Sequence, residues 1–281
     1  MTLLSPAELV AADGAVLRTY TAGRPDRPAV VVASACGMPA PLCHRWMDVL
    51  AADHHVITWE TRGLFGEPGG PEAFDDLGHR VADQAADLIA VMDHHGVPVA
   101  HLMGLCGGAV IALRAAADRP DRVASLSLWH GDYSGSPGWP TTDHQDNLKA
   151  LLAIGAGDRA DAAAINAALA STTTADLPPD VVELVAHPYS DDELFYRYCV
   201  LTGAIMHTDV RGLLASVPHP SLVVTSEDDH TAHPAGSHRV AEALPGGVLR
   251  VEPHGDHISV FGAGERLQLL LTEFLETQRH V

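Results

Sequence analysis

Short blocks of hydrophobic residues along the chain predict strands, and the spacing inside each block indicates which face is buried. Residues 7–21 contain two strand-like stretches that meet at Asp13-Gly14, a dipeptide typical of β-hairpins. A β-branched run at 28–34 and the run His-Val-Ile-Thr-Trp-Glu at 55–60 each predict a buried strand.

Helical patterns fall between these runs. Residues 42–52 are compatible with a helix, and 73–96 has apolar residues at helical spacing and a closing glycine, which predicts one long helix. A strand at 98–104, a helix ending near Ala117 and a strand at 123–131 follow. Regular alternation of strand and helix predicts a mostly parallel sheet with helices on both faces, the α/β class.

The pattern changes over residues 132–215, which contain alanine-rich helical stretches and turn clusters but no convincing strand. We therefore expect a helical cap at 132–215 inserted into an α/β core formed by 1–131 and 216–281. The alternation resumes with a strand at 220–226, a helix near 235–244, a strand at 247–253 and a final helix within 258–278.

The charge balance limits the classes of partner. The formal net charge is −19, and Lys149 is the one lysine among 17 basic residues. Such a surface repels a phosphate backbone and anionic lipid, so we expect neither nucleic acid nor a membrane as partner. No apolar run approaches the roughly 20 residues that cross a bilayer. The first residues lack the features of a signal peptide, which favours a cytoplasmic protein.

Four cysteines occur without metal-binding or disulfide-framework spacing, and we expect reduced thiols and neither metal nor cofactor. Cys106 differs because it lies in Gly104-Leu105-Cys106-Gly107-Gly108, between a predicted strand and a predicted helix. A nucleophile on such a turn is held in a strained backbone conformation and points into the cleft above the sheet. The neighbouring glycines permit close approach of the two backbones.

Two further segments supply partners for a cysteine nucleophile. A proline-led strand at 220–226 ends in acidic residues that include Asp229, and the loop after the last predicted strand carries His257. The Gly-x-Cys-x-Gly motif, then Asp229, then His257, resembles the α/β-hydrolase fold superfamily over essentially the whole chain, with cysteine in place of the usual serine. The resemblance implies a triad of Cys106, His257 as base and Asp229 as acid.

Alternatives remain at each position. Cys106 is also compatible with a small buried residue at a glycine-rich strand end. Asp228 or Asp132 are rival acids, because some members of this fold carry the acid after the preceding strand. His254 is a rival base, since it lies in the same loop as His257.

An oxyanion hole is expected from backbone N–H groups at the start of the helix after Cys106 and in the loop after the third strand. Gly107 supplies the first. Cys36 supplies the second, or Ala35 if the loop is one residue tighter; the loop departs from the family's His-Gly sequence. Residues 59–66 resemble the family segment that forms the site floor.

Sulfur at the elbow favours a thioester intermediate, since a thiolate attacks carbonyls readily. Dienelactone hydrolase and some thioesterases and acyltransferases of this fold share the Cys-His-Asp arrangement. The resemblance implies acyl transfer or hydrolysis on an activated ester or thioester, with a small-molecule acyl substrate or a coenzyme A or carrier-protein thioester as donor. A carrier protein would require basic residues such as Arg45, Arg62 and Arg197 to converge. A lyase or C–C bond enzyme and a ligand-binding receptor are the rival classes.

Overall fold

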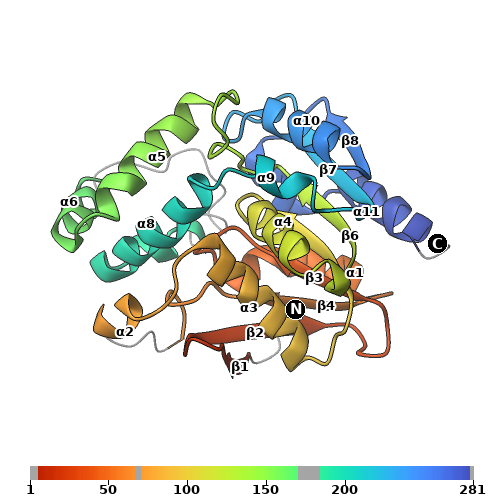
Figure 1. The fold of residues 1–281 in the computed structure, drawn as a ribbon, viewed down its shortest axis with the longest axis horizontal. Coiled ribbons are helices and arrows are strands. Elements are labelled where there is room, and N and C mark those ends of the chain that lie inside the picture. Colours follow the sequence, from red (N-terminus) through yellow and green to blue (C-terminus); the bar gives the residue numbers. More distant parts are fainter. Residues whose placement is uncertain (1–5, 67–70, 170–183, 279–281) are drawn as a thin grey trace.

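The computed structural model describes residues 6–66, 71–169 and 184–278, and its centre is one eight-stranded sheet (Figure 1). The strands lie in the order β1-β2-β4-β3-β5-β6-β7-β8. Their bounds are β1 Ala7–Val10, β2 Val16–Ala22, β3 Ala29–Ala33, β4 His55–Trp59, β5 Ala100–Leu105, β6 Val123–Trp129, β7 Ser221–Ser226 and β8 Gly247–Glu252.

The strand directions match the sequence pattern. β1 and β2 form an antiparallel hairpin, and β2 also runs antiparallel to β4. Every later pairing is parallel, from β3 with β4 to β7 with β8. Each of the central strands β4, β5 and β7 is buried at every position, which is typical of parallel strands covered on both faces. The predicted α/β class and the mostly parallel sheet are confirmed.

Helices cover both faces of the sheet. α3 (Val81–His94), α4 (Gly108–Asp118) and α10 (Pro234–Ala243) lie over one face, and α1 (His44–Leu50) and α11 (Glu265–Gln278) lie over the other (Figure 1). Because parallel strands all end at the same edge, the loops that follow β3, β5, β6, β7 and β8 meet at one end of the sheet.

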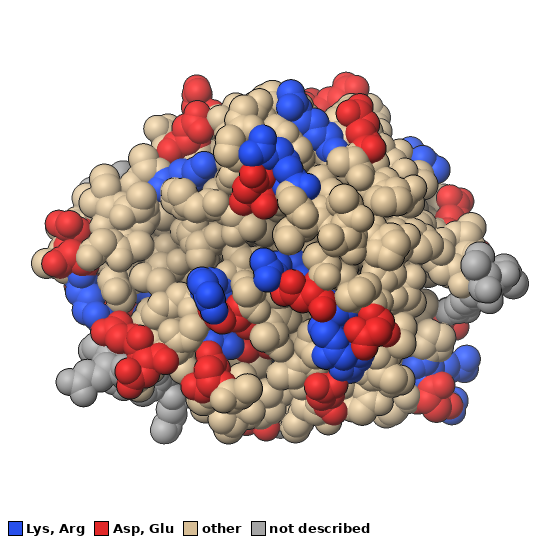
Figure 2. Space-filling model, viewed as in Figure 1, with Lys and Arg blue, Asp and Glu red and all other residues tan. Residues whose placement is uncertain are grey.

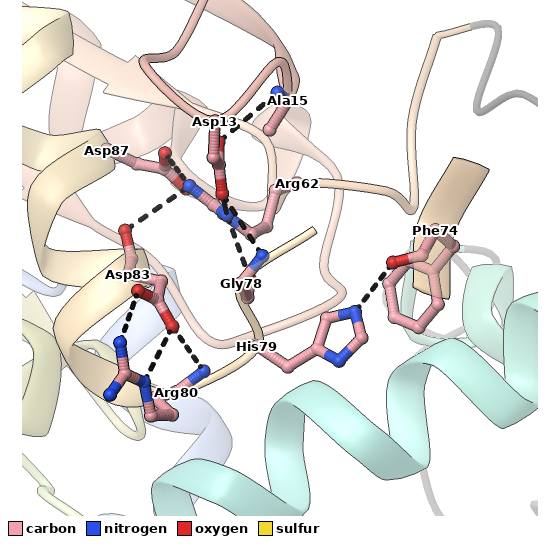
Figure 3. A network of polar contacts seen from close by, with 9 residues as sticks. All are labelled: Asp13, Ala15, Arg62, Phe74, Gly78, His79, Arg80, Asp83 and Asp87. Atoms are coloured by element: carbon pink, nitrogen blue, oxygen red, sulfur yellow. Dashed lines mark hydrogen bonds and ion pairs between the residues drawn. The ribbon is translucent and has the colours of Figure 1, made fainter. Parts of the chain in front are cut away.

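The single helix predicted over 73–96 is wrong: the structure has α2 (Pro71–Asp75) and α3 with a break between them. The break is held by the Arg62 guanidinium, which donates to the Gly78 carbonyl at 2.8 Å and also ion-pairs with Asp13 (Figure 3). Gly78 N–H in turn donates to the Asp13 carboxylate at 3.1 Å. These tertiary contacts replace the helical hydrogen bonds that local periodicity suggested.

The last helix also begins later than predicted. Residues 257–262 form a 3₁₀ turn, η4 (His257–Gly262), and Ala263 in the left-handed conformation ends it before α11. The buried Trp46 of α1 holds this turn, because its indole Nε1–H donates to the Val260 carbonyl at 2.6 Å. His257 therefore lies at the start of an anchored turn rather than inside a helix.

Between β6 and β7 the described residues form helices and no strand, as predicted. α5 (Asp143–Gly155), α6 (Arg159–Leu169) and α8 (Asp192–Met206) pack side by side at one edge of the molecule, beyond the strand ends (Figure 1). A 3₁₀ turn, η3 (His187–Tyr189), and α9 (Arg211–Leu214) complete this insertion. The division into a core at 1–131 and 216–281 and a cap at 132–215 stays a prediction.

Acidic and basic side chains are interspersed on the face seen in Figure 2, many as neighbouring red and blue pairs. Exposed ion pairs between near neighbours in the chain, such as Arg24–Asp26 and Arg211–Asp209, also join opposite charges on the surface. Among the described residues, no helix is both long and apolar enough to cross a membrane.

Candidate active site

Cys106 occupies a sharp turn between β5 and α4. Its φ is 53°, a left-handed conformation that costs a non-glycine residue roughly 1–2 kcal/mol. The flanking glycines are required by close packing: a Cβ on Gly108 would lie 2.0 Å from the Ala33 carbonyl oxygen, and one on Gly104 would lie 2.5 Å from the Ala109 Cα. The packing explains the Gly-x-Cys-x-Gly pattern, and it leaves the Cys106 side chain partly exposed.

His257 and Asp229 are hydrogen-bonded to each other. The distance from His257 Nδ1 to Asp229 Oδ2 is 3.0 Å, and both residues are buried. A carboxylate can only accept, so Nδ1 carries the hydrogen and Nε2 is the nitrogen left for acid–base chemistry. The other Asp229 oxygen, Oδ1, accepts from the backbone N–H groups of Thr231 and Ala232 at 2.9 and 2.8 Å.

A second imidazole binds the same carboxylate. His130 follows β6 directly, has a left-handed φ of 47°, and its Nδ1 lies 2.8 Å from Asp229 Oδ2. Burial alone would raise the pKa of Asp229, but the hydrogen bonds from His130 and His257 outweigh it and hold that pKa well below its usual range. Asp229 is therefore a fixed carboxylate at neutral pH.

Cys106 acts electrostatically on His257. Burial favours the neutral ring, but the neighbouring Cys106 sulfur and the Asp229 carboxylate raise the pKa of His257 well above its ordinary value. His257 Nε2 is buried, and no described residue forms a hydrogen bond with it. Contacts of this kind commonly tighten only when substrate is bound.

The rival residues are placed elsewhere or bonded differently. Asp228 and His254 contact each other at 3.2 Å on the surface, where their side chains are 54% and 88% exposed. Asp132 accepts from the Ser134 N–H at 3.0 Å and from Gln145 Nε2 at 2.7 Å, and neither is a histidine. The geometry thus joins His257 to Asp229 and to no rival acid.

The predicted oxyanion donors lie next to Cys106. Gly107 is the N-cap of α4, and neither its N–H nor that of Cys36 donates to another described residue. The loop carrying Cys36 is fixed at the next residue, where Gly37 N–H donates to Thr61 Oγ1 at 3.0 Å. Ala35, the alternative donor, lines the same cavity. Unpaired N–H groups of this kind are suited to a developing oxyanion.

The other three thiols are buried and inert by comparison. Burial raises the pKa of Cys36 and of Cys43 to about 11, and that of Cys199 to about 12. Cys36 lines the cavity beside Cys106, so a second thiol does lie near the site. Thiols with such pKa values stay protonated at neutral pH and are poor nucleophiles.

A cavity of about 680 Å³ opens above Cys106 and His257, within the range of about 300–1,000 Å³ that is usual for small-molecule sites. Residues of the insertion form much of its wall. The apolar side chains include Met38, Leu42, Leu148, Leu151, Val185, Ile205, Met206, Ile258 and Phe261, and the polar ones include Asp132, His144, Asn166, Thr202 and Thr231.

His130, Asp229 and His257 also form a group of potential metal ligands, with the three ligand atoms within 4.8 Å of one another. These are the atoms that form the two imidazole–carboxylate hydrogen bonds. A metal there would have to displace the hydrogens that orient both rings, so the donor set fits a hydrogen-bonded triad better than a metal centre.

The arginines suggested for a carrier protein do not converge. Arg62 is buried in ion pairs with Asp87 and Asp13 (Figure 3), and Arg197 binds Glu193 and the Gly63 carbonyl. Both guanidinium groups are buried, and carboxylates and backbone carbonyls already accept their hydrogen bonds. A buried charge requires such partners, because it has lost its hydration. Arg62 and Arg197 are thus not available to an acidic carrier, and the class of acyl donor stays a prediction.

Sequence reasoning missed three residues that support the site: His130, Thr61 and Gln145. His130 lies near the C-terminal end of the strand predicted at 123–131 and directly follows the observed β6, and this position at a strand end was the available signal. Thr61 lies in the 59–66 segment assigned to the site floor, but its bond to Gly37 depends on loop conformation. Gln145 belongs to a Thr-x-x-Gln capping box at the start of α5, a motif that predicts a helix start but not the bond to Asp132.

Comparison with known proteins identifies the family of this chain. The model described as "Alpha/beta hydrolase family" matches residues 9–267, so the chain belongs to the alpha/beta hydrolase family and is a hydrolase-class enzyme. A protein of Variovorax paradoxus (strain S110) named "Putative carbamate hydrolase RutD" is 29% identical over 84% of this chain and 86% of its own length. A protein of the same name from Pseudomonas savastanoi pv. phaseolicola is 28% identical over 90% and 95%.

Solved structures of low sequence identity share the fold. The 2-hydroxy-6-oxo-6-phenylhexa-2,4-dienoate hydrolase of Rhodococcus sp. strain RHA1 superposes with a TM-score of 0.74 at 19% identity, covering 98% of this chain and 100% of the other. The enol-lactonase of Burkholderia xenovorans LB400 gives a TM-score of 0.70 at 22% identity, covering 96% and 100%. At these identities the likeness establishes the fold alone.

Proposed function

We propose that the protein is an acyl-transfer enzyme that works through a covalent thioester on Cys106, with His257 as acid–base and Asp229 as its orienting carboxylate. The substrate is an activated ester or thioester, and the enzyme acts as an acyltransferase or as a thioesterase or esterase. The observation that carries the proposal is the elbow cysteine beside an imidazole whose other nitrogen is bound to a buried carboxylate.

The reaction begins with a thiolate–imidazolium pair. The Cys106 sulfur attacks the carbonyl carbon, and the negative charge moves to the carbonyl oxygen, where the N–H groups of Gly107 and Cys36 (or Ala35) are placed to bind it. The bond to the leaving alcohol or thiol then breaks, and His257 Nε2–H donates its proton to that group. The acyl group is now a Cys106 thioester.

In the second half, His257 Nε2 accepts a proton from water or another acceptor as its oxygen, nitrogen or sulfur attacks the thioester. Collapse of the tetrahedral intermediate releases the acid or the transferred acyl product and restores the thiolate–imidazolium pair. Because a thioester reacts more readily with amines and thiols than with water, we expect transfer to such acceptors to compete with hydrolysis.

A small donor suits the site better than a carrier protein. Arg62 and Arg197 are engaged inside the protein and are not available to an acidic carrier. The names of the two relatives extend the substrate class to carbamates. Attack by Cys106 on a carbamate ester would release the alcohol and leave an S-carbamoyl group, so the same machinery accommodates this chemistry.

Mass spectrometry tests the proposal. The protein is incubated with p-nitrophenyl esters, thioesters and carbamates of small acyl groups, and the released p-nitrophenolate or thiol is followed while the intact mass is recorded. We expect a mass increase equal to the acyl or carbamoyl group, mapped by peptide analysis to Cys106. Cys106→Ala should lose both the label and turnover, whereas Cys36→Ala and Cys43→Ala should keep both.

Other outcomes would assign a different class. Full activity in Cys106→Ala, or label confined to Cys36 or Cys43, would reject the thioester. Cleavage of a C–C bond without acylation of Cys106 would indicate a lyase-type enzyme on this fold. Release of every ligand unchanged would indicate a receptor. Partition of a preformed acyl-enzyme between water and millimolar amines, alcohols or thiols separates hydrolase from transferase.

A further inference from the structure

Asp132 places a carboxylate in the wall of the cavity, and it is not hydrogen-bonded to His257 or Cys106. It follows β6 by a few residues and is the first residue of the predicted insertion. Its side chain is held by two hydrogen bonds, from Ser134 N–H and Gln145 Nε2, and both end on Oδ1. Both hydrogen bonds leave Oδ2 without a donor from the described residues, and Oδ2 is not a fully buried atom. Because Asp132 lines the cavity, Oδ2 is the carboxylate oxygen left for a ligand.

The support around Asp132 is rigid. Gln145 is buried, and its Oε1 accepts from the backbone N–H groups of Thr142 and His233 at 3.1 Å each. The Gln145 amide is thus oriented by two segments, the insertion through Thr142 and the loop after β7 through His233. In this orientation its Nε2 donates to Asp132. A carboxylate held in this way presents its remaining oxygen in a fixed direction.

Apart from the catalytic His257, which is paired with Cys106, the described cavity wall offers no cation to balance Asp132. None of its described lining residues is lysine or arginine, and residues 67–70 and 170–183, which lie outside the described residues, contain neither in the sequence. The Lys149 ammonium donates to the Ser134 carbonyl at 2.9 Å and is not among the described lining residues. Desolvation and the His257 imidazole lower the pKa of His144, so this lining histidine is neutral at pH 7.

The wall elsewhere is dominated by aliphatic and aromatic side chains, so the site combines one negative group with an apolar surface. An anionic substituent, such as a carboxylate or phosphate, that lies against Asp132 would meet a like charge and no lysine or arginine of the described wall. An ammonium, or a neutral N–H or O–H group, would donate to Asp132 Oδ2 through a charge-assisted hydrogen bond.

We infer that Asp132 is a specificity residue that selects substrates with an apolar body and a hydrogen-bond-donating or cationic end group, and that rejects anionic ones. The inference rests on the proposed acyl-enzyme function for its kinetic readout. It concerns the substrate's end group, whereas the chemistry at Cys106 concerns its carbonyl.

A matched substrate series tests this inference. The first series consists of p-nitrophenyl esters with straight acyl chains, from butanoyl to hexanoyl, that end in methyl, hydroxyl, ammonium or carboxylate. The second series consists of thioesters that carry the same end groups on the leaving thiol. In at least one series kcat/KM should be about tenfold or more higher for the ammonium or hydroxyl end than for methyl, and lowest for carboxylate.

Substitutions assign the preference to Asp132. Asp132→Asn keeps the shape and an acceptor for Gln145 but removes the charge, so the discrimination between ammonium and carboxylate should fall by about tenfold. Asp146→Asn, an exposed change on α5 outside the cavity wall, is the control and should leave discrimination unchanged. Circular dichroism and thermal melting of both variants show whether folding is retained.

A binding measurement separates failure of this inference from failure of the proposed function. Amides with the same end groups are titrated calorimetrically into Cys106→Ala, which needs no turnover, and the ammonium or hydroxyl compound should bind most tightly. Equal affinities and equal kcat/KM across the end groups, or a preference for carboxylate, would overturn the role of Asp132 even if Cys106 is acylated. Selective binding without acylation would support Asp132 while rejecting the thioester.

Discussion

His130 and His257 donate to the same oxygen of one buried carboxylate. Their Nδ1 atoms lie 2.8 and 3.0 Å from Asp229 Oδ2, and the two rings are nearly perpendicular, with centroids 5.9 Å apart. The candidate acid is therefore clamped by two imidazoles on Oδ2 and by two backbone N–H groups on Oδ1. Four donors on one carboxylate leave its position little freedom, and the orientation of His257 follows from it.

Removal of the Asp229 charge should disable the enzyme. Asp229→Asn keeps the side-chain size but can present an NH₂ group to His257 Nδ1, which favours the wrong tautomer, so we expect kcat to fall by roughly 10³–10⁴-fold. Steady-state kinetics on an activated ester measures the loss. The control is Asp228→Asn, an exposed neighbour paired with His254, and near wild-type rates are expected for it.

His257→Ala should lose turnover by roughly 10²–10⁴-fold, the usual range for an acid–base residue. The same assay on His254→Ala serves as the matched comparison, since His254 lies three residues away and is exposed. If the two variants lost activity equally, the acid–base role would not belong to His257.

His130→Phe should reveal a positioning role for His130. Phenylalanine keeps an aromatic ring but donates no hydrogen bond, so the Asp229 charge is concentrated on its bond to His257, whose pKa rises. We expect kcat to drop by about tenfold and the alkaline limb of the pH–rate profile, on which the His257 imidazolium is lost, to move to higher pH. His130→Asn retains an N–H donor and tolerates the left-handed backbone, and should recover part of both effects. An unchanged pH profile in His130→Phe would contradict this role.

Gly108→Ala should destabilise the fold by about 3 kcal/mol or more, because the new Cβ overlaps backbone rather than a movable side chain. That Cβ would meet the Ala33 carbonyl oxygen at 2.0 Å. Gly212→Ala, also in a helix but with no atom within 4 Å of its Cβ, should be neutral or stabilising by up to about 1 kcal/mol. Urea unfolding compares the two, and equal stabilities would refute the packing argument.

The buried His101 should make the protein sensitive to acid. Both ring nitrogens contact serine hydroxyls, of Ser125 and Ser127, at 2.8 Å, and burial lowers the pKa of His101 to about 3. Between pH 6.5 and about 3 the unfolded chain binds a proton that the folded chain excludes. The free energy of unfolding therefore falls by about 1.4 kcal/mol for each pH unit of acidification in that window.

Unfolding of His101→Gln between pH 4 and 7 tests this contribution. We expect His101→Gln to be less stable at pH 7. Its free energy of unfolding should fall less steeply on acidification, by about 1.4 kcal/mol per pH unit, than that of the wild type. His94→Gln, an exposed change, should follow the wild type. Parallel pH curves for wild type and His101→Gln would show that His101 is not the group responsible.

The sequence by itself determined the α/β class, the strand order of appearance and the elbow around Cys106. Those features depend on local patterns: period-two and period-3.6 hydrophobicity, the hairpin at Asp13-Gly14, and small residues where two backbones nearly touch. The pairing of Asp229 with His257 was predicted from the family resemblance, and the geometry agrees with it, although their roles in catalysis stay a proposal.

Only the tertiary structure decided which of several similar side chains meet. The loops after the predicted strands offered three candidate acids and two candidate bases: Asp132, Asp228, Asp229, His254 and His257. The choice among them depends on loop conformations, which leave no periodic signal in the sequence. The same holds for the break between α2 and α3, where Arg62 replaces helical bonds, and for His130, which reaches Asp229 across 99 residues of sequence. Contacts between distant segments are set by how the strand ends pack, and a one-dimensional pattern does not encode that geometry.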